Sequence, residues 1–139
     1  LDQTVLTNKT PILGICLGMQ LLTNGSEEGK ESGLGWINGN AKRFKFPKDE
    51  KLKVPHMGWN TVTNSTKSKL TENFHDEAKF YFVHSYYVQV EDQKNSILKT
   101  NFGIEFDSAI QNNSIYGAQF HPEKSHKFGI KLLENFAKL

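Results

Sequence analysis

Apolar residues occur in short runs along this chain, and the runs alternate with polar segments rich in Gly and Asn. The first run, residues 11–15, is typical of a buried strand, and it ends at a cysteine flanked by glycines, which indicates a tight turn. Residues 17–23 predict a short helix, which the pair Asn24 and Gly25 would end. Residues 29–39 hold four Gly among polar positions and predict a surface loop.

The middle of the chain has the composition of β structure. Residues 79–90 are rich in Phe, Tyr and Val, which favours one bent strand or two. Shorter strands are expected over residues 96–100 and 103–111. The pair at 112–113 predicts a hairpin turn into a further strand over residues 114–120.

The end of the chain has a helical period. Phe128, Leu132 and Phe136 recur every four residues, so an amphipathic helix of about four turns is expected from Ser125 onward. Strands followed by helices at both ends of a β-rich middle indicate the α/β class, with an antiparallel insertion in the sheet.

Length and charge narrow the class of protein. The chain has 139 residues, 37% of them hydrophobic, with ten Phe, which is enough for the core of one soluble domain. The net charge is +2 and there is a single Arg, which argues against nucleic-acid recognition, since that usually depends on Arg. The densest basic stretch, residues 42–48, is better explained as a solvated strand or hairpin than as a phosphate or RNA contact.

Cysteine content and hydropathy bear on the compartment. The single Cys excludes an internal disulfide and suits a reducing compartment, so a cytoplasmic location is expected. No apolar run approaches 18 residues, so no membrane span is predicted, and the first residues are too polar for a secretory signal.

The pattern G-x-C-x-G at residues 14–18 is the first candidate for chemistry. It follows an apolar strand and precedes a helix, as in the nucleophile elbow of hydrolases. Glycines on both sides would avoid clashes at the sharp turn, and the helix dipole would favour a Cys16 thiolate. The Leu17 N–H could donate to a developing oxyanion. A structural cysteine packed between glycines is the alternative, and the pentapeptide alone does not separate the two.

A histidine and a carboxylate near the end of the chain complete the chemistry. A thiol needs a base to take its proton, and an imidazole needs a partner on its other nitrogen. His121 and Glu123 are two residues apart with Pro122 between them, so in extended chain both side chains face one site. The alternatives are a solvated histidine at a strand end and a charge that stabilises a helix N-terminus.

Four segments of this sequence resemble one family. Residues 14–20 and 119–123 are similar to the two signature segments of class I (triad) glutamine amidotransferases. Residues 54–60 and 81–87 are similar to the glutaminase subunits of imidazole glycerol phosphate synthase, from histidine biosynthesis, and the segment from residue 121 onward fits the same subunits.

The resemblance implies a fold. It is the flavodoxin-like class I glutamine amidotransferase fold of the α/β class, with a central, mostly parallel sheet and an antiparallel β insertion. Residues 1–139 would form one glutamine amidotransferase domain, the C-terminal portion of the family's subunit. The N-terminal strands would then be missing, together with a Gly-rich loop that supplies the second oxyanion donor, and the strand at 11–15 would have an exposed edge.

The resemblance also implies an activity, the hydrolysis of L-glutamine to glutamate and ammonia through a cysteinyl thioester. Cys16 would be the nucleophile, His121 the general base and acid, and Glu123 its orienter. Four further residues would bind the substrate: Leu17, Gln20, Ser85 and Tyr86. No cofactor and no metal are implied.

Three residues match positions at a subunit interface, namely Trp59, Tyr81 and Lys124. The partner would be a cyclase subunit with a (β/α)8 barrel, forming a heterodimer and receiving the ammonia. Without the resemblance, a place in the core is the better explanation for the aromatic pair, and a polar surface position for Lys124 and Gln20.

Other functions stay open, one of them implied by relatives of the same family. The same glutaminase chemistry could supply a sugar-amidating enzyme of surface polysaccharide synthesis. A truncated chain could be an inactive interaction domain, or a cysteine hydrolase could act on another substrate such as a γ-glutamyl peptide. A zinc site at His56 and His84 is rejected, because neither has a carboxylate or Cys partner at ligand spacing.

Overall fold

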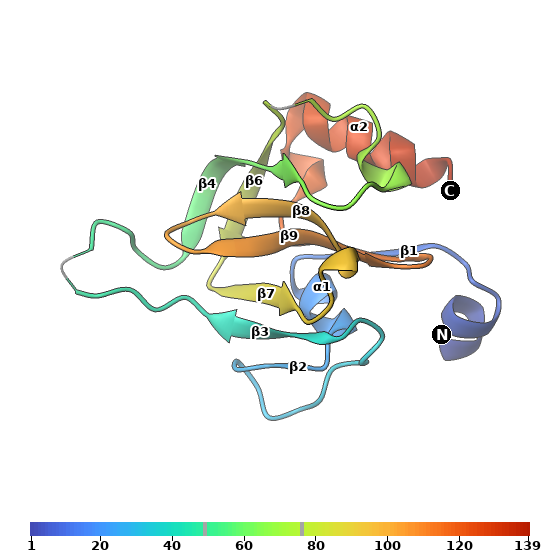
Figure 1. Ribbon diagram of the computed structural model, residues 1–139, viewed down its shortest axis with the longest axis horizontal. Helices are drawn as coiled ribbons and strands as arrows, with labels where there is room; N and C mark the ends of the chain where they lie inside the picture. The colour runs from blue at the N-terminus through green and yellow to red at the C-terminus, as the bar shows by residue number, and fades with distance from the viewer. Residues whose placement is uncertain (49, 76) are drawn as a thin grey trace.

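The computed structural model describes residues 1–48, 50–75 and 77–139, and Figure 1 shows the arrangement of the elements. The strands are β1 (Ile12–Ile15), β2 (Gly25–Ser26), β3 (Gly39–Arg43), β4 (His56–Thr61), β5 (Thr63–Asn64), β6 (Lys79–His84), β7 (Tyr86–Val90), β8 (Ser96–Asn101), β9 (Glu105–Asn112) and β10 (Ile115–Ala118). The α-helices are α1 (Leu17–Leu22) and α2 (His126–Ala137). Shorter helical turns are η1 (Gln3–Thr7), η2 (Lys69–Thr71), η3 (Gln93–Asn95) and η4 (Pro122–Lys124).

The strands that the structure describes form three sheets. The largest has the order β1-β10-β9-β8-β5, the second the order β2-β3-β7, and the third pairs β4 with β6. The expected β segment at residues 79–90 is two strands rather than one, and Ser85 separates them. Its halves belong to different sheets, since β6 pairs with β4 and β7 pairs with β3.

The α/β class is confirmed, but the expected mostly parallel sheet is wrong for the described strands. In the largest sheet only β1 and β10 run parallel, and β9, β8 and β5 follow antiparallel. The reason lies in the connections. β8, β9 and β10 are joined by hairpins of two or three residues, and so short a connection can only return the chain antiparallel. Asn113, with a φ of 54°, makes the predicted turn between β9 and β10.

The strand β1 is at one edge of the largest sheet, and its surroundings differ from the expectation. A buried strand was expected over residues 11–15, yet none of the four residues of β1 is buried. Only β10 pairs with it among the described strands, so its other edge is unpaired there, and its four residues are half-buried rather than exposed. The unpaired edge agrees with the expectation drawn from the family resemblance.

The core is divided between the two faces of the largest sheet. In β10, Tyr116 belongs to a cluster rich in Phe, while Ile115 belongs to a second cluster with Met19 and Leu22 of α1. Successive strand residues point to opposite faces, which explains this division. The Phe-rich cluster is tightly stacked, with the rings of Phe80 and Phe120 3.9 Å apart.

The C-terminal helix follows the predicted period. In α2, Leu132 is fully buried, and Phe128 and Phe136 pack at the edge of the Phe-rich cluster. Figure 1 shows α2 lying beside β6, and the contacts with β6, η2 and η4 agree. In the described part of the chain, no helix has the length and apolar character that crossing a membrane would require.

Candidate active site

Cys16 lies at the turn between β1 and α1, in a backbone conformation that is rare for residues other than glycine. Its φ is 55° and its ψ is −110°. Its N–H donates to the Ala118 carbonyl of β10 at 2.8 Å, so the turn is held to the neighbouring parallel strand. Such a conformation costs on the order of 1–3 kcal/mol and typically occurs at functional sites. This geometry agrees with the nucleophile elbow expected from the sequence.

The two glycines of the elbow differ in their roles. A Cβ on Gly14 would lie 2.6 Å from the Gly18 carbonyl oxygen, so a side chain there would displace the backbone of α1. A Cβ on Gly18 would meet nothing within 4 Å among the described atoms. The expectation of clashes on both sides is therefore right for Gly14 and wrong for Gly18, because position 18 faces away from β1.

His121 and Glu123 form a pair, as expected. The Nδ1 of His121 and the Oε1 of Glu123 are 2.6 Å apart. The backbone differs from the extended chain that was expected, because Glu123 lies in the helical turn η4 and only His121 is extended. The carboxylate occupies Nδ1, so Nε2 is the nitrogen that is free to exchange a proton with a substrate or thiol.

The loop that carries His121 is anchored to β6 by Ser125, which sequence reasoning missed. The Tyr81 N–H donates to Ser125 Oγ at 2.9 Å, and this hydroxyl donates to the His121 carbonyl at 2.6 Å. The His121 N–H in turn donates to the Tyr81 carbonyl at 3.0 Å. A fully buried Ser with both partners on the backbone has no pattern that the sequence alone would reveal.

Cys16 and His121 follow the ends of adjacent parallel strands. Ile15 pairs with Ala118, Cys16 comes next on one strand, and His121 follows on the other. Among the described groups, the Cys16 sulfur is hydrogen-bonded to the Val83 carbonyl at 3.9 Å and to the Gln119 amide at 3.6 Å, and not to His121. Catalytic hydrogen bonds often form only when substrate is bound, so the arrangement is compatible with a thiol–imidazole pair.

The electrostatics of Cys16 differ from the expectation. Burial raises the pKa of the thiol above its usual value, and the negative charges of Glu123 and Glu28 raise it further. The Leu17 N–H and the Gln119 amide lower the pKa, but by less than burial raises it. The start of the helix acts in the expected direction, since the Leu17 N–H lowers the pKa, but desolvation outweighs it and the net pKa of the thiol is raised.

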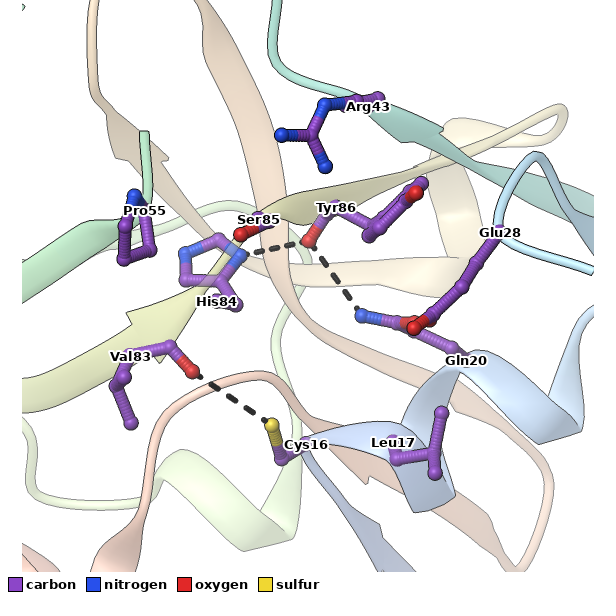
Figure 2. A pocket seen from close by; sticks show the side chains of 10 residues that line it. All are labelled: Cys16, Leu17, Gln20, Glu28, Arg43, Pro55, Val83, His84, Ser85 and Tyr86. Atoms are coloured by element: carbon purple, nitrogen blue, oxygen red, sulfur yellow. Dashed lines mark hydrogen bonds between the residues drawn. The ribbon is translucent and has the colours of Figure 1, made fainter. Parts of the chain in front are cut away.

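A cavity of about 480 Å³ opens beside the cysteine, and Figure 2 shows the side chains that line it. Its lining consists of Cys16, Leu17, Gln20, Glu28, Arg43, Pro55, Val83, His84, Ser85 and Tyr86. All four residues predicted to bind substrate are in this lining, and His121 and Glu123 are not. The structure thus brings five separate segments of the chain around the cavity beside the thiol.

Gln20 is almost completely buried in this wall, with 6% of its surface exposed. Its Nε2 donates to the Tyr86 carbonyl at 3.4 Å and to Gln119 Oε1 at 3.2 Å. Its Oε1 is buried without a hydrogen-bond partner among the described atoms. Burying an unpaired polar atom is costly, so Gln20 is held in this wall at an energetic cost that its two donated hydrogen bonds only partly offset. The alternative of a polar position on a surface helix is wrong for Gln20.

Two charged residues of the cavity were not predicted. Glu28 lies on the loop after β2, and Arg43, at the end of β3, holds its guanidinium 5.6 Å from the centre of the Tyr86 ring. Arg43 belongs to the basic stretch that we expected to be solvated. Sequence spacing carries no signal for either residue, because the loop and β3 approach the elbow only through the tertiary fold.

Two of the predicted interface residues lie side by side on the small sheet. Trp59 of β4 pairs with Tyr81 of β6, and Trp59 also stacks on His126 with ring centres 5.5 Å apart. Trp59 is 48% exposed, so the core alternative is wrong for that residue. Lys124 is exposed in η4, next to the Ser125 that binds Tyr81.

His56 and His84 contact each other. His56 Nδ1 lies 2.8 Å from His84 Nε2, and both rings are buried. Burial lowers the pKa of His56 to about 3, and the neighbouring His84 lowers it further. Burial likewise lowers the pKa of His84 to about 4, against an opposing hydrogen bond to the Tyr86 carbonyl.

The strained cysteine elbow, the histidine–carboxylate pair and the cavity with a buried glutamine agree with the site expected of a cysteine-dependent amidotransferase. The sequence matches the family described as "Glutamine amidotransferase class-I" over residues 1–139, and the chain belongs to that family.

Two curated relatives are similar over nearly the whole chain. The "Imidazole glycerol phosphate synthase subunit HisH 2" of Methanococcus maripaludis is 59% identical over 138 residues, which are 99% of this chain and 67% of the relative. The "Imidazole glycerol phosphate synthase subunit HisH" of Leptospira borgpetersenii is 47% identical over 140 residues, covering 100% of this chain and 69% of the relative. The chain therefore spans about two thirds of the length of these relatives.

The fold is similar to that of a solved amidotransferase domain. The glutaminase domain of CTPS from Trypanosoma brucei, solved with bound acivicin, superposes with a TM-score of 0.64 at 18% identity, covering 99% of this chain and 64% of that domain. At this identity the likeness supports the fold alone.

Proposed function

We propose that the chain carries out the glutaminase step of imidazole glycerol phosphate synthase in histidine biosynthesis. It hydrolyses L-glutamine to glutamate and ammonia and passes the ammonia to a cyclase partner. The observation that carries the proposal is the juxtaposition at the ends of β1 and β10, where the strained Cys16 elbow lies beside the strand that leads to the His121–Glu123 pair. The names of the similar relatives agree with this activity.

The geometry supports a division of roles. Because burial raises the pKa of the Cys16 thiol, its proton has to be taken by a base as the sulfur attacks the amide carbon. His121 Nε2 takes this proton, and Glu123 on Nδ1 stabilises the imidazolium that forms. The Leu17 N–H stabilises the oxyanion of the tetrahedral intermediate.

The two half-reactions then follow in order. The intermediate collapses, the C–N bond breaks, and His121 returns the proton to the departing nitrogen, which leaves as ammonia. His121 next takes a proton from water, and the hydroxide attacks the γ-glutamyl thioester. The C–S bond breaks, glutamate leaves and the thiol recovers its proton. Gln20, Ser85 and Tyr86 hold the amino-acid end of the substrate in the cavity.

The chemical test uses the fact that the chain has a single cysteine. A glutamine-like electrophile should add its mass to Cys16, excess glutamine should prevent the labelling, and Cys16→Ser should take no label and show no glutaminase activity. His121→Ala should lower the rate about 10²–10⁴-fold. Labelling by a generic thiol reagent but not by the glutamine analogue would contradict the proposal.

The partner that we propose is a cyclase subunit with a (β/α)8 barrel, which forms a heterodimer through Trp59, Tyr81 and Lys124. An exposed Trp is the residue type that most often dominates an interface, so Trp59→Ala should weaken assembly at least about 30-fold. Leu34, on the loop between β2 and β3, is 47% exposed and provides a matched control. Equal effects of Trp59→Ala and Leu34→Ala on the dissociation constant would refute this interface.

A further inference from the structure

A chain of hydrogen bonds connects the β4–β6 sheet to the wall of the active-site cavity. Asn60 Nδ2 lies 3.1 Å from His56 Nε2, His56 Nδ1 lies 2.8 Å from His84 Nε2, and His84 Nδ1 lies 2.7 Å from the Tyr86 carbonyl. Figure 2 shows the last contact, from the His84 ring to the Tyr86 carbonyl.

The direction of each hydrogen bond can be assigned from the Tyr86 end. A carbonyl only accepts, so His84 Nδ1 carries the proton. The lowered pKa values make both rings neutral near pH 7, and a neutral imidazole has a single N–H. His84 Nε2 is therefore an acceptor, which requires His56 Nδ1 to donate and His56 Nε2 to accept.

The Asn60 end leads independently to the same assignment. The Thr61 N–H donates to Asn60 Oδ1 at 2.8 Å, which fixes the orientation of the amide. Asn60 Nδ2 donates to the Asn101 carbonyl at 2.9 Å and has a second hydrogen for His56 Nε2. All the bonds thus run in one direction, and the chain ends at the Tyr86 carbonyl.

The Tyr86 carbonyl is connected to the cysteine by further hydrogen bonds. The carbonyl oxygen also accepts a hydrogen bond from Gln20 Nε2, which donates as well to Gln119 Oε1. The Gln119 amide nitrogen in turn donates to the Cys16 sulfur. Ser85, which precedes it, belongs to neither β6 nor β7. The hydrogen bond from His84 therefore holds the wall at the point where two sheets separate.

The packing around His56 keeps this chain of hydrogen bonds rigid. Its ring stacks between Phe82 at 4.7 Å and Phe102 at 4.2 Å, and only 3% of its surface is exposed. Burying a polar imidazole costs free energy that an apolar side chain would not. Packing alone therefore does not explain two imidazoles within a cluster of Phe rings. Among the described residues, the hydrogen bonds of the two rings connect Asn60 at one end to the cavity wall at the Tyr86 carbonyl.

We infer that His84, held in one orientation by His56, is a positioning residue that sets the Tyr86 carbonyl and thereby shapes the pocket for the amino-acid substrate. This role rests on the proposed glutaminase function. His84 touches no reacting atom; it acts through Tyr86 and Gln20. Its loss should therefore weaken glutamine binding more than the chemical step, a pattern that appears as a raised KM with little change in kcat.

Two conservative variants of His84 test its positioning role, each measured in the complex with the proposed synthase partner. The amide nitrogen of His84→Asn can occupy the Nδ1 position and still donate to Tyr86. The amide of His84→Gln reaches the Nε2 position, so the bond to His56 survives and the bond to Tyr86 is lost. We expect KM for glutamine to stay within about twofold in His84→Asn and to rise about tenfold in His84→Gln. We expect kcat to stay within about threefold in both.

Asn135→Leu is the matched control for a general loss of stability that does not act through the cavity. Asn135 is 5% exposed, and its amide donates to the Leu70 and Glu72 carbonyls, away from the cavity. This variant should lower the unfolding temperature and leave KM unchanged. A similar KM rise in Asn135→Leu and His84→Gln, or equal KM values in the two His84 variants, would overturn the positioning role. A wild-type protein without glutaminase activity would overturn the proposed function instead, so the two failures are distinguishable.

Discussion

Replacing Gly14 by Ala tests whether the elbow depends on the close approach of β1 and α1. The added Cβ would lie 2.6 Å from the Gly18 oxygen and 2.7 Å from the Gly18 carbonyl carbon, while ordinary contacts begin near 3.4 Å. The start of α1 would therefore have to move by about 0.8 Å, and both atoms belong to the backbone, so no side-chain rotation relieves the clash.

The expected cost follows from overpacking. We expect Gly14→Ala to lower the free energy of unfolding by about 1–3 kcal/mol. Gly18→Ala is the matched control. Position 18 lies in α1, nothing occupies the space that its Cβ would take, and Ala favours a helix over Gly by up to about 1 kcal/mol. One glycine of the motif should therefore be essential for stability, and replacing the other should be neutral or stabilising.

Urea unfolding of the two variants and the wild type measures these differences, and glutaminase turnover measures their consequence at Cys16. A displacement approaching 1 Å at the nucleophile can cost about 10²-fold in rate, so Gly14→Ala should lose activity even in the fraction that stays folded. An unchanged unfolding midpoint for Gly14→Ala, or a larger destabilisation by Gly18→Ala, would refute the close packing of β1 on α1.

Three further predictions concern buried ionisable groups. Asp107→Ala removes a 2% exposed carboxylate that lies 2.7 Å from Lys99 Nζ and accepts from the Val90 N–H at 2.8 Å. It leaves both partners unpaired, so the free energy of unfolding in a denaturant titration should fall by about 3 kcal/mol. Alkylation of Cys16 by a small reagent, followed against pH, should have a midpoint above that of free cysteine, because burial raises its pKa. The pKa values of His56 and His84 in the folded protein are about 3 and about 4, so between these values and about pH 6.5 the unfolded chain binds their protons more readily than the folded protein. The contribution of the two neutral histidines to the free energy of unfolding should therefore be complete above about pH 6.5 and should decrease as the pH falls toward 4 and 3.

Each of these predictions has a control in the same chain. Lys45→Ala removes an exposed ion pair with an N–O distance of 3.9 Å and should change stability by less than about 0.5 kcal/mol. Glu123→Gln removes a negative charge that raises the thiol pKa, so the alkylation midpoint should fall. His75→Gln, at an exposed position, should keep the loss of stability in acid, whereas His84→Gln should reduce it. An acid-stability curve that is the same for all three proteins would exclude the buried pair as its cause.

Local features of the chain were determined by the sequence alone. The strand–turn–helix at residues 12–22 follows from an apolar run, a glycine and a short helical stretch, and the period of Phe128, Leu132 and Phe136 produces α2. The His121–Glu123 contact was predicted for an extended chain, and it forms instead across the start of η4, with His121 extended and Glu123 in the helical turn. These features depend on neighbours within a few residues, where backbone geometry leaves few choices.

Only the tertiary structure decided what surrounds the cysteine. Its sulfur meets the Val83 carbonyl and the Gln119 amide, which lie 67 and 103 residues away in the sequence. Burial at this place in the fold raises the thiol pKa by more than the Leu17 N–H and the Gln119 amide lower it. Likewise, His56 and His84 carry no sequence signal for one another, and they meet because β4 pairs with β6 in a register that places them opposite. Spacing along a chain constrains local geometry, whereas desolvation and hydrogen-bond partners depend on which distant strands the fold places side by side.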